Sequence, residues 1–195
     1  MSGYEDILGA NARIWFYLRR NSSKGRRIAD SKLKTKKVLG KNKVCVPKVL
    51  GLLETQQEVR DFQWEQLEGN FVIKPASGSG GRGVLVVKKR AKWAGEWFLM
   101  DGKKVNVSDL RLHCSDILEG RFSLYGKADQ VLVEDRIKIH PKFLRFTNSG
   151  TPDVRIIVFN YVPVMAMLRL PQEESEGKAN LHQGAIGLGD RKSVV

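Results

Sequence analysis

A glycine-rich loop between two apolar runs is the segment of this 195-residue chain best suited to hold a phosphate. The sequence from residue 71 to 87 is FVIKPASGSGGRGVLVV. Glycine tolerates positive φ angles, so successive backbone N–H groups can converge on phosphate oxygens. Hydroxyl and cationic side chains add donors and charge to such a site. We therefore predict that a phosphate is bound by Lys74 and by the loop residues Ser77, Gly78, Ser79, Gly80, Gly81, Arg82 and Gly83.

This loop differs from a Walker-type phosphate loop, because no Gly-Lys-Ser/Thr element opens a helix after it. The flanking runs, 71–75 and 84–88, are apolar and rich in β-branched residues, and they predict two strands. An ordinary hairpin has the same pattern and is the alternative. The Lys-Pro pair before the loop and Arg82 within it favour phosphate binding.

Two arginines lie in apolar stretches that predict an antiparallel strand pair, 155–160 and 164–170. Arg155 precedes the run IIVF, and Arg169 follows the run MAML. An unpaired guanidinium is costly in apolar surroundings, so we expect each arginine to have an anionic partner. A transferred phosphoryl group is one such partner, because the arginine fork suits its spread charge. A structural ion pair with a protein carboxylate is the alternative.

The sequence predicts the helices and strands that must position these residues. Periodicity and capping residues predict helices over 6–20, 31–39, 55–62 and 108–119, with a break at 21–25 and with Asp30 or Ser31 capping the second helix. Strands are predicted over 49–53, 71–75, 84–88 and 131–134, besides the pair 155–160 and 164–170, which we expect to turn through 161–163. A hairpin is predicted at 101–102. The pattern is that of an α+β protein with two lobes.

The chain is strongly basic, with a formal net charge of +13 at pH 7. Much of the excess lies between Arg13 and Lys48, where Asp30 is the one acidic residue. Such a surface attracts nucleic acid or other anions. A solvated basic surface beside a phosphate site is the simpler interpretation and the one we favour over nucleic acid. No apolar run approaches the about 20 residues that cross a bilayer, and no signal peptide is visible, so we expect a cytoplasmic protein without a membrane partner.

Several blocks of the sequence, in the same order, resemble the ATP-grasp carboxylate–amine ligases, most closely the glutamate-ligase-related branch, in which we include the sugar-transfer-associated ATP-grasp proteins. The blocks are GANAR (9–13), ADSKLKTKKVL (29–39), VPKVLG (46–51), FVIKPASGSGGRGVLVV (71–87), VLVEDRI (131–137), PDVRIIV (152–158), AMLRLP (166–171) and ANLHQGAIGLG (179–189). The resemblance implies an ATP-grasp fold in which two α+β lobes grip ATP. It further implies an N-terminal helical segment at 1–50, a first lobe with loop and hinge at 51–137, and a second lobe at 138–189.

The resemblance also implies a role for each matching residue. Lys32 and Lys74 would grip the ATP phosphates, and the loop 77–83 would cover them as a flap. The hinge that reads the adenine edge would comprise Glu134, Asp135, Arg136 and Ile137. On the paired strands, Arg155 and Arg169 would face the transferred phosphoryl group and the acyl-phosphate. Asn180 and His182 match the Asn-Leu-His element that lines the substrate side.

The family holds Mg²⁺ with carboxylates and an asparagine downstream of this element, and Mg²⁺ requires such oxygen ligands. No Glu-x-Asn follows Asn180, so no residue of this chain is predicted to bind the metal. The last six residues, 190–195, abandon the strand pattern and resemble the translation of a sequencing-adaptor oligonucleotide. We therefore expect a C-terminally truncated, inactive fragment with a non-native tail.

The function implied for the parent protein is ATP-dependent formation of an amide or peptide bond through an acyl-phosphate. The partners would be ATP, Mg²⁺, an anionic carboxylate substrate such as glutamate, and an amine acceptor. A non-catalytic nucleotide- or RNA-binding module that uses the basic N-terminal segment is the alternative. A phosphotransferase or a sugar-linked acyl transfer on the same fold is a further one.

Overall fold

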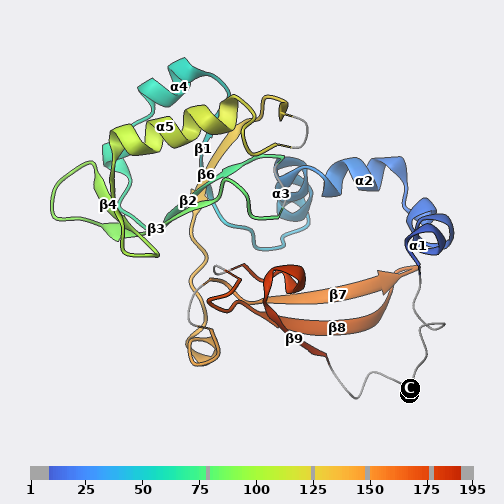
Figure 1. Cartoon of the computed structure of the whole chain (residues 1–195). Coiled ribbons are helices and arrows are strands. Elements are labelled where there is room, and N and C mark those ends of the chain that lie inside the picture. The colour runs from blue at the N-terminus through green and yellow to red at the C-terminus, as the bar shows by residue number, and fades with distance from the viewer. Residues whose placement is uncertain (1–8, 78–79, 124–125, 148–149, 176–177, 190–195) are drawn as a thin grey trace. The chain divides into compact units, whose positions relative to one another are not determined.

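The computed structural model describes residues 9–77, 80–123, 126–147, 150–175 and 178–189 (Figure 1). The chain divides into two compact units, Met1–Val46 and Pro47–Val195, and each is described by itself. The finer division into lobes at 51–137 and 138–189 stays a prediction. Within the described residues, no helix is long and apolar enough to cross a bilayer. The expected non-native tail, 190–195, lies outside the described residues.

The first unit is helical. It contains α1 (Ala10–Phe16), a short 3₁₀ helix (Leu18–Arg20), α2 (Ser23–Ala29) and α3 (Lys32–Lys41). The side chain of Ser31 accepts a hydrogen bond from the Lys34 amide at 3.3 Å, which confirms the predicted helix and its cap. The predicted break at 21–25 is confirmed at Asn21 and Ser22 but is shorter than expected, because Ser22 accepts from the Gly25 amide at 3.0 Å and caps α2, which begins at Ser23.

The second unit begins with a six-stranded antiparallel sheet of order β1-β6-β2-β3-β4-β5. Its strands are β1 (Val49–Leu53), β2 (Phe71–Pro75), β3 (Leu85–Arg90), β4 (Glu96–Leu99), β5 (Lys104–Asn106) and β6 (Val131–Asp135). The helices α4 (Gln56–Asp61) and α5 (Val107–Leu118) accompany it, together with a 3₁₀ helix at Trp64–Gln66. Both α-helices begin with a capping box, formed by Thr55 with Glu58 and by Asn106 with Asp109. The predicted strands and the hairpin near residue 101 are confirmed.

Alternation along the central strands places a hydrophobic core on one face of this sheet. Phe71 and Ile73 of β2 are buried, as are Val131 and Val133 of β6, and they share a cluster with residues of α4 and α5. Trp97 of β4 completes the cluster, with its ring edge-to-face to Phe71 at 5.8 Å between centroids. Because side chains alternate along a strand, Lys74 and Glu134 lie on the opposite face.

A three-stranded antiparallel sheet follows, of order β7-β8-β9. Its strands are β7 (Asp153–Phe159), β8 (Val162–Leu170) and β9 (Ile186–Gly189), with 3₁₀ helices at Pro141–Phe143 and Leu181–Gln183 nearby in the chain. The predicted pair is confirmed, but its turn is wrong. The chain reverses at Asn160 and Tyr161, both with positive φ, as in a two-residue hairpin. The strand β9 was not predicted, since two of its four residues are glycine.

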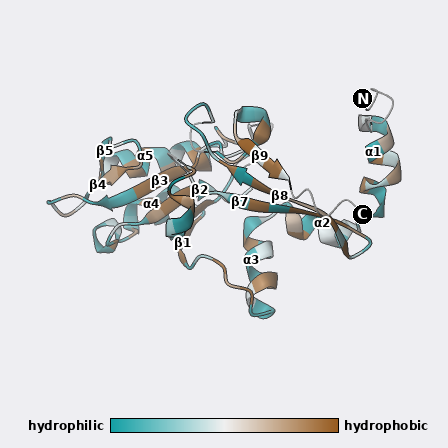
Figure 2. Ribbon diagram, turned by 90° about the horizontal axis from the view of Figure 1, so that it is seen from below, coloured by the Kyte–Doolittle hydropathy of each residue, from teal (hydrophilic) through white to brown (hydrophobic). Residues whose placement is uncertain are grey.

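Hydrophobic and hydrophilic residues both occur along the strands of the three-stranded sheet (Figure 2). One face holds Val154 and Ile156 of β7 with Leu188 of β9, which are 62%, 55% and 51% exposed. The register Asp153↔Arg169 and Arg155↔Met167 places both arginines on the other face, as their predicted joint role requires.

The buried Trp97 offers a test of the core. We expect Trp97→Ala to lower the free energy of unfolding by about 3–5 kcal/mol, because it removes a fully buried indole and leaves a cavity. Trp93 lies four residues away and is 66% exposed, so Trp93→Ala should stay within about 0.5 kcal/mol of the parent. Urea unfolding of the two variants measures the difference. Equal losses would contradict the placement of the core.

Candidate functional site

An ion pair between Lys74 and Glu134 lies at the centre of the six-stranded sheet. Lys74 is opposite Leu132 in the β2–β6 register and Glu134 is opposite Val72, so the two side chains are diagonal neighbours on the face away from α5. Their side chains are 20% and 5% exposed, respectively. The pair holds an ammonium group one residue before the end of β2, where the glycine loop begins.

The glycine loop is held at both ends by side chains from distant parts of the chain. At its start, the Ser77 amide donates to both carboxylate oxygens of Asp129 at 3.1 Å. At its end, the Gly83 carbonyl lies 3.0 Å from Nε2 of His113 on α5. Because a carbonyl oxygen only accepts, Nε2 of His113 is the protonated nitrogen. Gly78 and Ser79 lie outside the described residues.

Left-handed backbone conformations explain the glycines of this loop. Gly80, Gly81 and Gly83 have φ angles of 68°, 73° and 70°. At Gly83 a Cβ atom would also lie 2.5 Å from the ring of Phe122, so the position excludes every other residue. Arg82, between them, is exposed. The three described glycines of the loop therefore adopt the positive φ angles that glycine tolerates.

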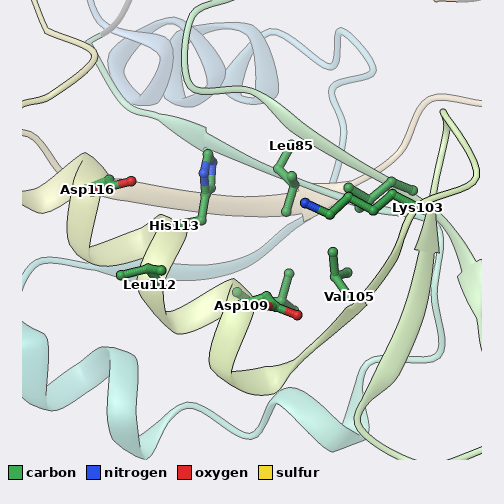
Figure 3. A pocket seen from close by; sticks show the side chains of 9 residues that line it. Leu85, Lys103, Val105, Asp109, Leu112, His113 and Asp116 are labelled. Atoms are coloured by element: carbon green, nitrogen blue, oxygen red, sulfur yellow. The ribbon is translucent and has the colours of Figure 1, made fainter.

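His113 is neutral near pH 7. Desolvation by burial lowers its pKa below the ordinary value of 6.5, and the hydrogen bond to Gly83 and the charge of Asp116 oppose the shift more weakly. The ring also borders a cavity of about 230 Å³ between β3, β5 and α5 (Figure 3). The cavity is lined by Leu85, Leu99, Lys103, Val105, Asp109, Leu110, Leu112, His113 and Asp116.

The predicted hinge follows directly from the central sheet. Its first residue, Glu134, turns its carboxylate to Lys74. The amides of Asp135 and Arg136 donate to the carbonyls of Lys48 and Asn70 at 2.9 and 2.7 Å. Ile137 is 55% exposed, and its main chain makes no hydrogen bond within the described part of the chain. Of the four predicted hinge positions, Ile137 is thus one whose main-chain donor and acceptor are not used within the described part of the chain, and the role of the hinge stays a prediction.

Arg155 and Arg169 share a face of the second sheet but differ in surroundings. Arg169 is 14% exposed and donates to both oxygens of Asp153, at 2.7 Å from Nε and 2.5 Å from Nη2. This hydrogen-bonded pairing raises the pKa of the guanidinium further above its ordinary value. Arg155 is exposed, so the expectation that burial demands an anionic partner is wrong for this residue.

The remaining predicted residues lie in turns or in the first unit. Asn180 is half-buried and donates through Nδ2 to Oε1 of Gln183 at 3.0 Å, while the adjacent His182 is exposed. Lys32 is half-buried at the first position of α3. The roles assigned to these three residues stay predictions.

Asp129, His113 and Phe122 contact the loop but were not predicted. No motif marks them, and each lies 30 or more residues from its partner in the loop. Among the described residues, no group of three or more His, Cys, Asp and Glu side chains is arranged to hold a metal.

The chain matches one protein family over most of its length. The model of the sugar-transfer associated ATP-grasp family matches residues 11–190. The chain belongs to this family. The match and the two antiparallel sheets fit an ATP-grasp-like fold and support ATP-dependent, ligase-type activity, but they do not support the glutamate-ligase branch. Comparisons with curated proteins and with solved structures gave no match.

Removal of one partner of the buried Lys74–Glu134 pair should cost far more than removal of one partner of an exposed pair. We expect Lys74→Met to cost about 3–5 kcal/mol of unfolding free energy, because it removes the Lys74 ammonium from a buried carboxylate. Lys104→Met removes a more exposed ion pair with Glu96 and should cost at most about 1 kcal/mol. The double variant Lys74→Met, Glu134→Leu should recover most of the loss in urea unfolding. A double variant no better than the single one would refute this.

The lowered pKa of His113 predicts a pH dependence of stability. Above pH 6.5 the ring is neutral in both the folded and the unfolded chain, and it contributes no pH dependence. As the pH falls below this value, the unfolded chain takes up a proton that the folded chain resists, so the free energy of unfolding decreases. Unfolding of the parent and of His113→Gln at about pH 7.5 and about pH 5.5 isolates the effect. The parent should lose more stability than the variant on acidification.

Proposed function

We propose that this protein is an ATP-dependent carboxylate–amine ligase that forms an amide or peptide bond through an acyl-phosphate. The observation that carries the proposal is the Lys74 ammonium at the start of an anchored glycine loop, on a chain of the ATP-grasp family. An ammonium has three N–H donors, and the bond to Glu134 uses one of them. Two donors therefore remain for phosphate oxygens, beside the amides of the loop.

The paired strands would supply the charge that the phosphoryl group requires. Arg155 and Arg169 lie on one face, and Asp153 fixes the orientation of the second guanidinium through two hydrogen bonds. Phosphoryl transfer is catalysed mainly by positioning and electrostatics, so oriented arginines of this kind are suited to it. Arg155 is exposed and is the cation of the two that an approaching anion can reach.

The proposed reaction has two steps. An oxygen of the substrate carboxylate attacks the γ-phosphorus of ATP, and ADP leaves. The nitrogen of an amine then attacks the acyl carbon of the acyl-phosphate, and phosphate leaves through a tetrahedral intermediate. The developing negative charge in both steps would be met by Lys74, the loop amides and the arginines.

The family typically pairs ATP with Mg²⁺. The described residues do not fit a resident metal site, because they contain no cluster of carboxylate or other ligands arranged to hold one. No step of the proposal therefore uses the metal. The net charge of +13 favours an anionic carboxylate substrate, of which glutamate is an example.

A nucleic-acid-binding module is the second candidate, and the basic side chains exposed on α2 and α3 favour it. It predicts RNA binding that weakens steeply with salt and that does not depend on Lys74. The ligase proposal predicts instead nucleotide binding that does depend on Lys74.

Titration with a fluorescent ATP analogue tests the proposal. Lys74→Met should weaken binding by about tenfold or more, because it removes a charge-assisted hydrogen bond worth about 1.5–3 kcal/mol. The matched control is Lys88→Met, which removes an exposed lysine of β3 and should leave the affinity unchanged. The double variant Lys74→Met, Glu134→Leu guards against a folding defect and should bind as weakly as the single one. Equal affinities of all four proteins would overturn the assignment of Lys74, and RNA binding alone would favour the second candidate.

A further inference from the structure

We propose that His113 and Asp129 are positioning residues that hold the two ends of the glycine loop, so that a nucleotide meets a loop whose ends are already fixed. The inference rests on the proposed function for its consequence, but the anchoring itself is tested without nucleotide. Neither residue belongs to the predicted site, and neither is proposed to touch the nucleotide.

The start of the loop is tied to the start of β6. The Ser77 amide donates to Asp129, and the preceding Ala76 amide donates to the Gln130 carbonyl at 2.9 Å. Asp129 is itself oriented, because its Oδ1 also accepts the Gln130 amide at 2.8 Å. A carboxylate that accepts backbone N–H groups makes strong hydrogen bonds, and this one continues the β2–β6 pairing by one residue beyond Ala76.

The end of the loop is tied to α5 and the segment that follows it. His113 donates to the Gly83 carbonyl, and the ring of Phe122 fills the space beside the Gly83 Cα. The His113 and Phe122 rings are themselves in contact, with centroids 5.5 Å apart. The hydrogen bond and the ring together fix both the direction of the carbonyl and the backbone position.

The middle of the loop is open by comparison. A Cβ at Gly80 would meet nothing within 4 Å, and the nearest atoms to one at Gly81 would be aliphatic carbons of Lys178, at 3.5–3.7 Å. Fixed ends with an open centre lower the ordering cost when a ligand is bound, because fewer backbone torsions remain to be restricted.

The hydrogen bond to Gly83 and the contact with the Phe122 ring orient the imidazole, which is not tightly packed on every side. The cavity of about 230 Å³ borders His113, so packing does not enclose the ring on that side (Figure 3). Burial keeps the ring neutral, with its hydrogen on Nε2. Loss of this one bond should therefore release the end of the loop without a large loss of core packing.

Limited trypsin cleavage after the exposed Arg82 measures this release. We expect His113→Leu and Asp129→Ala each to raise the rate of cleavage after Arg82 by about 3- to 10-fold, the factor for one lost hydrogen bond. His113→Gln keeps an N–H donor and should stay within about twofold of the parent. His140→Leu, which changes a histidine of an exposed turn, is the matched control and should leave the rate unchanged.

Cleavage after Arg111, inside α5, serves as the internal reference for global unfolding. Faster cleavage after Arg82 with an unchanged rate after Arg111 supports local anchoring. A parallel rise at both sites, an unchanged rate after Arg82, or a failure of His113→Gln to restore the parent rate would overturn it.

Binding of the fluorescent ATP analogue then separates the two proposals. The anchor variants should bind the analogue about 3- to 10-fold more weakly, while Lys74→Met weakens binding without changing the relative rate of cleavage after Arg82. If the parent does not bind the analogue, the proposed function fails, and the cleavage rates still decide whether the anchors hold the loop. If the anchor variants release the loop but bind normally, anchoring stands and its consequence for the nucleotide is wrong.

Discussion

A buried lysine and glutamate, paired across two central strands, impose the main constraint on this fold. Neither Lys74 nor Glu134 is stable alone in its position, because burial of an isolated charge costs several kcal/mol. Their pairing requires β2 and β6 to be neighbours in one register, although 60 residues separate the two side chains in the sequence. That register sets where β2 ends, and the end of β2 sets where the glycine loop leaves the sheet. The ion pair and the start of the loop thus share one strand register.

The sequence predicted most elements of the fold because their signals are local. Strands β1 and β2 have the predicted bounds, since each is a short apolar run between turn residues. The misses have physical reasons. Helix α2 has a good cap in Ser22 but the sequence SKGRRIA has no apolar stripe, and its described residues include no buried one. The turn of β7 and β8 was misplaced because Tyr161 adopts a left-handed conformation that is rare for a tyrosine, whereas Pro163 is a familiar turn residue.

The candidate site was predictable in its composition but not in its contacts. A glycine loop after a lysine is visible in the sequence, and so is the phosphate chemistry of those residue types. The partners are not visible, because Asp129 is 52 residues from Ser77 and His113 is 30 residues from Gly83. Such contacts follow from strand order, and six strands permit many orders. Glu134 illustrates the limit, because the resemblance assigned it to the hinge, which stays a prediction, but gave no sign that its carboxylate pairs with Lys74 across the β2–β6 register.

The two arginines show why residue type alone does not define a catalytic role. Two guanidinium groups and the Asp153 carboxylate leave one net positive charge on this face of the sheet. Asp153 neutralises Arg169 locally and holds its fork rigid, so Arg169 meets a second anion only at the cost of sharing its donors. Among the described residues of this face, no carboxylate forms an ion pair with Arg155, so its charge is not neutralised. In the proposed ligase, Arg155 therefore attracts the phosphoryl group, and Arg169 provides a guanidinium of fixed orientation beside it. Asp153 and Arg155 lie two residues apart in the sequence PDVR, so in this proposal one strand provides both the carboxylate that orients Arg169 and the exposed arginine.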